Sequence, residues 1–123
     1  MDMNGKYVDG LELPLPKDKV EAYKAFSKKA GDVWKAHGAL EYIECIADDV
    51  KPGKLTSFPQ AVKLEPDEVV VFSWIVYDTR EGRDRINAAV MSDPRLKQHM
   101  DPKSAPFDAK RMIWGGFNVL LAM

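Results

Sequence analysis

The chain has 123 residues, of which 46% are hydrophobic and 30% charged, a composition typical of one soluble globular domain, residues 1–123. With 18 basic and 19 acidic residues its formal net charge is −1, which gives no electrostatic attraction to nucleic acid or to an anionic membrane. No segment approaches the roughly 20 apolar residues that span a bilayer, and the polar N-terminus does not resemble a signal peptide. Cys45 is the only cysteine, which rules out an intrachain disulfide and fits a reducing compartment, so we expect a cytoplasmic protein.

The first part of the chain predicts a strand, a helix and a second strand. Residues 6–13 mix Tyr, Val and Leu with polar side chains and stop at two prolines, which indicates a strand. From Lys17 to His37 the apolar residues follow a helical period, and Gly38 is a typical left-handed stop. Residues 40–47 alternate as expected of the second strand.

The most informative segment is residues 68–77, which predict a strand that is apolar on both faces. Before it, residues 48–59 predict a loop, and residues 61–64 a short strand that turns at Pro66-Asp67. A strand that is apolar on both faces must be covered on both. Because the chain offers helices for only one face, we expect another copy of the chain to cover the second.

The C-terminal part predicts a second helix, a short helical restart and a last strand. Thr79 is a suitable N-cap for the helix, and Asp93-Pro94 a suitable cap and first turn for the restart. Residues 101–108 predict a loop, and residues 111–121 a strand flexed at Gly115-Gly116. The order strand, helix, strand, strand, helix, strand predicts an α+β, ferredoxin-like antiparallel sheet with two helices on one face.

A series of short motifs runs through nearly the whole chain: Tyr7-Val-Asp-Gly10, Gly38-Ala-Leu40, Glu44-Cys45, Ala61-Val-Lys63, Phe72-Ser-Trp-Ile75, Met91-Ser-Asp-Pro-Arg95, Phe107-Asp-Ala-Lys-Arg-Met-Ile113 and Gly115-Gly-Phe117. In this order they resemble the YbaA family, which consists of small bacterial proteins of unknown function. The resemblance implies a ferredoxin-like subunit that pairs into a dimeric α/β barrel. The wider superfamily includes small monooxygenases, haem-degrading and dismutating enzymes, and ligand-binding regulators. The family itself has no agreed activity, so the resemblance carries over no catalytic residue.

Glu44 is the first candidate site residue, because the second strand places it on one face with Tyr42. Inside a barrel, desolvation would raise the pKa of such a carboxyl and suit it to general-base work. The alternative is an interface carboxylate paired with a basic residue, or an acid at the wet mouth of the barrel. Phe72 and Trp74, with Trp114 from the last strand, are expected to line the same small-molecule pocket, or else to form plain core or dimer interface.

Asp9 and Arg111 are expected on neighbouring strands, where they form a buried ion pair or a recognition point for an anionic ligand. The ion pair is favoured because an unpaired buried charge is costly. Cys45 is expected to be a buried, inert thiol, and His37 to cap the end of its helix. His37 and His99 lack a metal-ligand spacing, and the sequence holds no cofactor fingerprint, so we expect neither a metal nor a cofactor.

These residues do not identify an activity. The first hypothesis is a homodimeric barrel that binds a small apolar or aromatic metabolite, with or without acting on it. The alternative is a non-catalytic structural or interaction module, because the sequence shows no nucleophile–base pair. A cofactor-free, monooxygenase-like enzyme or an RNA-associated protein comes third, and the chain has no basic run to support RNA binding.

Overall fold

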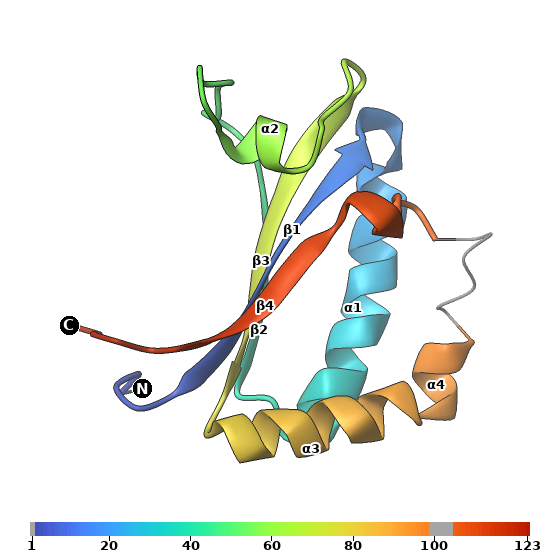
Figure 1. The fold of residues 1–123 in the computed structure, drawn as a ribbon. Helices are drawn as coiled ribbons and strands as arrows, with labels where there is room; N and C mark the ends of the chain where they lie inside the picture. Colours follow the sequence, from blue (N-terminus) through green and yellow to red (C-terminus); the bar gives the residue numbers. More distant parts are fainter. Residues whose placement is uncertain (1, 99–104) are drawn as a thin grey trace.

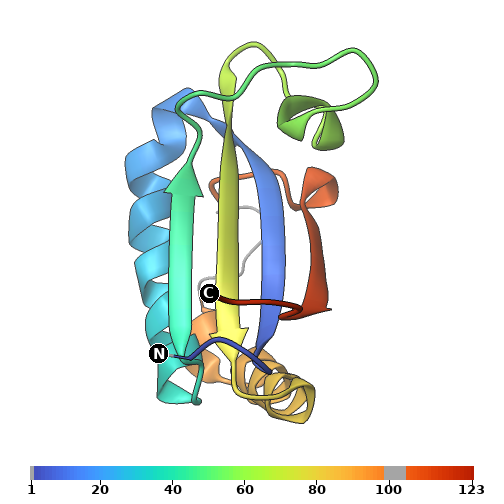
Figure 2. The same ribbon diagram turned by 90° about the vertical axis from the view of Figure 1, so that its left-hand side faces the viewer.

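In a computed structural model, which describes residues 2–98 and 105–123, four strands form one antiparallel sheet. Its strand order is β2-β3-β1-β4, which is the ferredoxin-like order and confirms the predicted α+β class (Figures 1 and 2). The strands are β1 (Tyr7–Pro16), β2 (Glu41–Ile46), β3 (Glu68–Tyr77) and β4 (Ile113–Asn118).

Helices α1 (Val20–Ala36), α3 (Arg80–Met91) and α4 (Pro94–Lys97) cover one face of this sheet (Figure 1). Helix α1 follows a 3₁₀ turn at Lys17–Lys19, and α4 is short. Figure 1 shows these three helices on one side of the strands, whereas α2 (Phe58–Ala61) lies on the other side at one end of the sheet. We call the side opposite α1, α3 and α4 the open face; Figure 2 views it directly.

The predicted helix starts are confirmed by their caps. The Thr79 hydroxyl accepts a hydrogen bond of 2.9 Å from the Gly82 N–H, and Asp93 Oδ1 accepts one of 2.9 Å from the Arg95 N–H. The strand predicted at residues 61–64 is wrong, since this part of the chain belongs to α2 and the turn after it. Ser57 caps α2 through the Gln60 N–H, and Gln60 in turn accepts from the Ser57 hydroxyl at 2.6 Å.

The core lies between the helices and the sheet, because alternate residues of β1 and β3 point toward the helices. One cluster joins Tyr7, Ile75 and Tyr77 of the strands to Val33 of α1 and Ile86 of α3. A second cluster, at the other end of the sheet, is built from Leu13, Leu15, Tyr23 and Val71. Burial of these side chains fixes the helices on the sheet and leaves the open face outside the core.

The prediction that β3 is apolar on both faces is confirmed. The face that points away from α1, α3 and α4 carries Val70, Phe72, Trp74 and Val76, and on this open face Phe72 remains 43% exposed. The pairing places Cys45 of β2 and Glu12 of β1 opposite Phe72. On β4, Ile113 and Phe117 continue the same face and are also exposed.

Gly31 offers a test of how tightly α1 packs on β2. A Cβ atom at Gly31 would lie 2.8 Å from a ring carbon of Tyr42, so the ring or the helix would have to move. We expect Gly31→Ala to lower the free energy of unfolding by about 1–3 kcal/mol, despite a gain in helix propensity of up to about 1 kcal/mol. Urea unfolding measures the change. In a Tyr42→Leu background the cost should disappear, and an equal cost in both backgrounds would contradict the packing explanation.

Candidate ligand-binding groove and open sheet face

An open groove of about 840 Å³ lies between α1 and the edge strand β2. Figure 2 shows α1 running beside this strand. The groove wall combines apolar side chains with a few polar groups and includes Leu15, Val20, Tyr23, Ser27, Gly31, Tyr42, Glu44, Ile46 and Val71. A concave, mostly apolar surface with a few fixed polar groups is the usual form of a small-molecule site.

The side chains that line this groove follow the helical period of α1 and the two-residue period of β2. On α1, Tyr23, Ser27 and Gly31 recur at four-residue spacing, so they share the face that is turned to the sheet. On β2, Tyr42 and Glu44 are two residues apart and point to the same side. Because Gly31 has no side chain, the Tyr42 ring lies directly against α1, and its hydroxyl is 3.0 Å from the Ser27 hydroxyl.

The polar side chains of the groove include the hydroxyls of Tyr23, Ser27 and Tyr42 and the carboxylate of Glu44, and charged residues of α1 (Glu21, Lys24, Lys28, Asp32 and Lys35) and Glu41 of β2 also line it. Burial, with a smaller contribution from the nearby charge of Glu44, raises the pKa of Tyr42 to about 12. Burial and then the charge of Glu44 also raise the pKa of Tyr23 well above its ordinary range. Both hydroxyls therefore stay protonated at neutral pH and can donate hydrogen bonds. Oε2 of Glu44, by contrast, is buried without a hydrogen-bond partner in the described part of the chain.

The aromatic candidates do not belong to this groove. Tyr42 and Glu44 pair with Ile75 and Ser73 on the helix-covered side, whereas Phe72 and Trp74 point to the open face. The expectation of one cavity lined by all four is therefore wrong within a subunit. Trp114 also differs from this expectation, because its position in β4 turns the ring toward the helix side of the sheet. There the Arg83 guanidinium lies 5.8 Å from the ring centroid.

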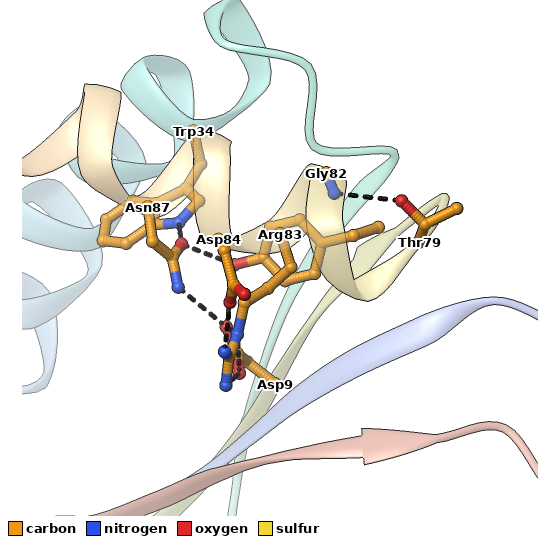
Figure 3. Close-up of polar contacts among 8 residues, drawn as sticks. Asp9, Trp34, Thr79, Gly82, Arg83, Asp84 and Asn87 are labelled. Carbon is orange, nitrogen blue, oxygen red and sulfur yellow. Dashed lines mark hydrogen bonds and ion pairs between the residues drawn. The ribbon is translucent and has the colours of Figure 1, made fainter.

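Asp9 is buried in a polar network that does not include Arg111 (Figure 3). Arg83 of α3 donates to Asp9 through Nε at 3.0 Å and lies 3.0 Å from it through Nη2. The Tyr77 hydroxyl donates to Asp9 at 2.9 Å and the Asn87 amide at 3.2 Å, while Trp34 Nε1 donates to Asn87 Oδ1 at 3.0 Å. Asp9 thus has a full set of donors and ties the sheet to α3 and, through Asn87, to α1.

The predicted Asp9–Arg111 pair is wrong because β4 starts later than expected. Its register places Gly116 opposite Asp9, and Arg111 lies in the 3₁₀ turn before the strand. There Arg111 donates to both carboxylate oxygens of Glu68 at 2.7 Å and to Asp108 at 3.0 Å. The hydrogen bonds from Arg111 to Glu68 lower the pKa of Glu68, so its carboxylate is charged and paired at neutral pH.

Glu12 is a candidate that was not identified from the sequence. It lies on the open face between Phe72 and Ile113, is only 6% exposed, and its Oε2 has no hydrogen-bond partner among the described residues. Burial raises the pKa of this carboxyl. The available signal was the alternation of β1, which puts Glu12 on the same face as Pro14 and therefore on the side away from Leu13 and Leu15.

The remaining candidates are the cysteine and the two histidines. Cys45 is exposed on the open face, so the expectation of a buried thiol is wrong. His37 ends α1 as predicted, and its Nε2 lies 2.8 Å from Asp93 Oδ2. His99 falls outside the described residues. Within residues 2–98 and 105–123, no group of three His, Cys, Asp or Glu side chains could hold a metal ion, and no helix is long and apolar enough to cross a membrane.

The fold and its surfaces define a ferredoxin-like α+β protein with a helix–sheet groove and an uncovered sheet face. In structure, the chain is similar to a NIPSNAP family protein of unknown function from Agrobacterium tumefaciens, with a TM-score of 0.56 and 13% identity, covering 94% of this chain and 89% of that one. It is also similar to an uncharacterised NIPSNAP-like domain protein from Burkholderia xenovorans, with a TM-score of 0.54 and 14% identity, covering 98% and 87%. At this identity the likeness concerns the fold.

The family follows from the sequence match. Residues 6–109 match the family described as "Protein of unknown function (DUF1428)", and the chain belongs to this family. It is 50% identical over 116 residues to the uncharacterised protein YbaA of Escherichia coli K12, covering 94% of this chain and 97% of that protein. The match to YbaA of Shigella flexneri has the same identity and coverage. The resemblance to the YbaA family is thereby confirmed.

The network around Asp9 predicts a large difference between two Asp→Asn substitutions. Asp9→Asn removes the charge that is paired with the mostly buried Arg83, and breaking such a pair costs about 3 kcal/mol or more. Asp78→Asn breaks the pair with Lys6, but Asp78 is 73% exposed, so we expect a cost below about 1 kcal/mol. Urea unfolding compares the two variants, and similar costs would show that the Asp9 network does not anchor α3.

Glu12 predicts a specific pH dependence of stability. Because the folded chain raises the pKa of Glu12 above its ordinary 4.5, this carboxyl favours folding at low pH and loses its contribution as the pH rises above that value. Glu12→Gln should remove this loss, so that the variant gains stability over the natural chain by about 1 kcal/mol between pH 4 and pH 7. Urea unfolding across this pH range measures the difference, and parallel pH profiles for the two proteins would contradict it.

Proposed function

We propose that this protein is a cytoplasmic, homodimeric small-molecule-binding protein whose groove between α1 and β2 holds an apolar or aromatic metabolite. The observation that carries the proposal is the groove itself, whose volume of about 840 Å³ is in the usual range of ligand pockets. Leu15 and Val71 supply apolar wall, and Tyr23 and Tyr42 supply aromatic rings and hydroxyl donors. Binding is proposed without a reaction.

Pairing of two chains is supported by the apolar side chains of the open face. Phe117 is 62% exposed, and Phe72 and Ile113 lie on the same face. A second copy presenting its own open face would cover all of them and close two sheets into a barrel. Burial of apolar surface is the main driving force for such association.

The C-terminal arm, residues 119–123, gives a second reason for pairing. Figure 1 shows the arm leaving β4 and pointing away from the sheet on the side of the open face. Two hydrogen bonds between Asn4 and the Ala122 backbone, at 3.0 and 3.1 Å, hold the arm in place. Leu120 is 98% exposed, so the arm presents apolar side chains that a partner subunit would bury.

In the proposed cytoplasmic compartment, the exposed Cys45 thiol stays reduced.

Oligomeric state tests the pairing. Light scattering after size exclusion should give twice the chain mass of 13.9 kDa. Phe117→Glu places a charge in the proposed interface and should give a monomer that keeps its circular dichroism spectrum, because Phe117 lies outside the core. Leu55→Glu is the matched control, since Leu55 is also exposed but lies in the loop before α2. A natural chain that is monomeric at micromolar concentration would contradict the proposal.

Ligand binding is tested by thermal shift against a metabolite library. A ligand that binds only the native state raises the melting temperature, and we expect apolar or aromatic compounds to do so. Backbone amide signals of Gly31 and Tyr42 should then move in proton–nitrogen correlation spectra, while those of Phe117 stay in place. A library without any stabilising compound would instead favour the non-catalytic structural or interaction module.

A further inference from the structure

We infer that the ligand of the groove between α1 and β2 is an amine, with an apolar or aromatic body and a positively charged end directed at Glu44. This inference rests on the ligand binding proposed above, but it does not depend on the pairing of two chains. Its basis is the carboxylate of Glu44, which lines the groove and whose Oε2 lacks a hydrogen-bond partner among the described residues.

Among the described residues, no cationic side chain forms an ion pair with Glu44. The nearest hydroxyl donors are Tyr23, beside the carboxylate, and Tyr42, whose hydroxyl is paired with Ser27 at 3.0 Å. A phenol donates a hydrogen bond but brings no positive charge. The charge of Glu44 is therefore felt by both tyrosines, where it raises the pKa of each hydroxyl.

Two of the three lysines that line the groove, Lys28 and Lys35, are directed elsewhere, and the third is Lys24. Lys35 Nζ donates to the Leu40 carbonyl at 2.8 Å, and Lys28 Nζ lies 3.8 Å from Asp32. No ion pair joins a basic side chain to Glu44 within residues 2–98 and 105–123. Glu44 is half-buried with a buried Oε2, and such a carboxylate without a cationic partner among the described residues is a site that a cation from outside can complete.

The same surroundings discriminate between ligand classes. A protonated amine gives a charge-assisted hydrogen bond, which is roughly twice as strong as a neutral one, so an amine is favoured over an alcohol of the same shape. A ligand carboxylate would be repelled by Glu44. The Tyr23 and Tyr42 rings add attraction for an ammonium group through their faces, and Leu15 and Val71 accept the apolar body.

The buried carboxylates of the sheet, Asp9, Glu12 and Glu68, show why Glu44 is the chosen residue. Glu68 is paired with Arg111 through two hydrogen bonds of 2.7 Å. Asp9 is saturated by Arg83, Asn87 and Tyr77, so it has no capacity left for a ligand. Glu12 also has a free oxygen, but it lies on the open face, away from the groove. Glu12 therefore serves as a matched control, because Glu12→Gln makes the same chemical change on the opposite side of the sheet.

Three probes with one aromatic body test the inference: phenethylamine, phenethyl alcohol and phenylacetate. Each is titrated into the full chain at neutral pH and millimolar concentration, and binding is followed by the amide signals of Gly31 and Tyr42. We expect the amine to bind at least about tenfold more tightly than the alcohol, and phenylacetate to bind least. Glu44→Gln should weaken the amine about tenfold and leave the alcohol unchanged, whereas Glu12→Gln should change neither.

The outcomes separate the two proposals. If phenylacetate or the alcohol binds as tightly as the amine, or if Glu44→Gln leaves amine binding unchanged, the inference about ligand class is overturned while ligand binding stands. If none of the three probes moves the groove signals, ligand binding in the groove is itself overturned. Amine binding that depends on Glu44 and not on Glu12 supports both.

Discussion

The burial of β3 is the constraint on which the rest of the structure depends. This strand is apolar on both sides and lies between β2 and β1. The chain covers one side with α1, α3 and α4, and there Ile75 and Tyr77 reach full or nearly full burial. On the other side α2 reaches only one end of the sheet, so Phe72 stays exposed. Val70 and Val76 on this side are buried within the chain, so the exposed ring of Phe72 marks the part of the strand where pairing is proposed.

Three carboxylates near the sheet differ in whether the described residues satisfy both of their oxygens, and this separates a structural role from a proposed binding role. Asp9 receives donors from Arg83, Asn87 and Tyr77, and these hold α3 and α1 against the strands. The hydrogen-bonding capacity of Asp9 is fully used within the chain, so its role is structural. Glu12 and Glu44 each keep one oxygen without a partner in the described part of the chain. Because an unsatisfied buried acceptor costs about 1–3 kcal/mol, these two positions are where a ligand or a second subunit can add most stability.

The order of elements and the helix caps could be predicted because their signals are local. Thr79 and Asp93 cap their helices through side chains that sit within a few residues of the amides they bind. The partners of Asp9 and the grouping of the aromatic residues could not be predicted in this way. A shift of one residue in strand register moves a side chain to the other face, and the late start of β4 brings Gly116 rather than Arg111 opposite Asp9. Glu12 was missed for a related reason, since its burial depends on Phe72 and Ile113 from two other strands.

The edge strand β2 connects the two proposed surfaces. Alternate residues of this strand face opposite ways, so Glu44 lines the groove while Cys45 belongs to the open face. On its outer side β2 has no neighbouring strand among the residues that the structure describes, and its position is set by pairing with β3 and by the contact of Tyr42 with Gly31 of α1. The width of the groove therefore depends on the same strand whose other face would meet a partner subunit. A ligand held between α1 and β2 and a subunit packed on the open face would both restrain this edge, one from each side.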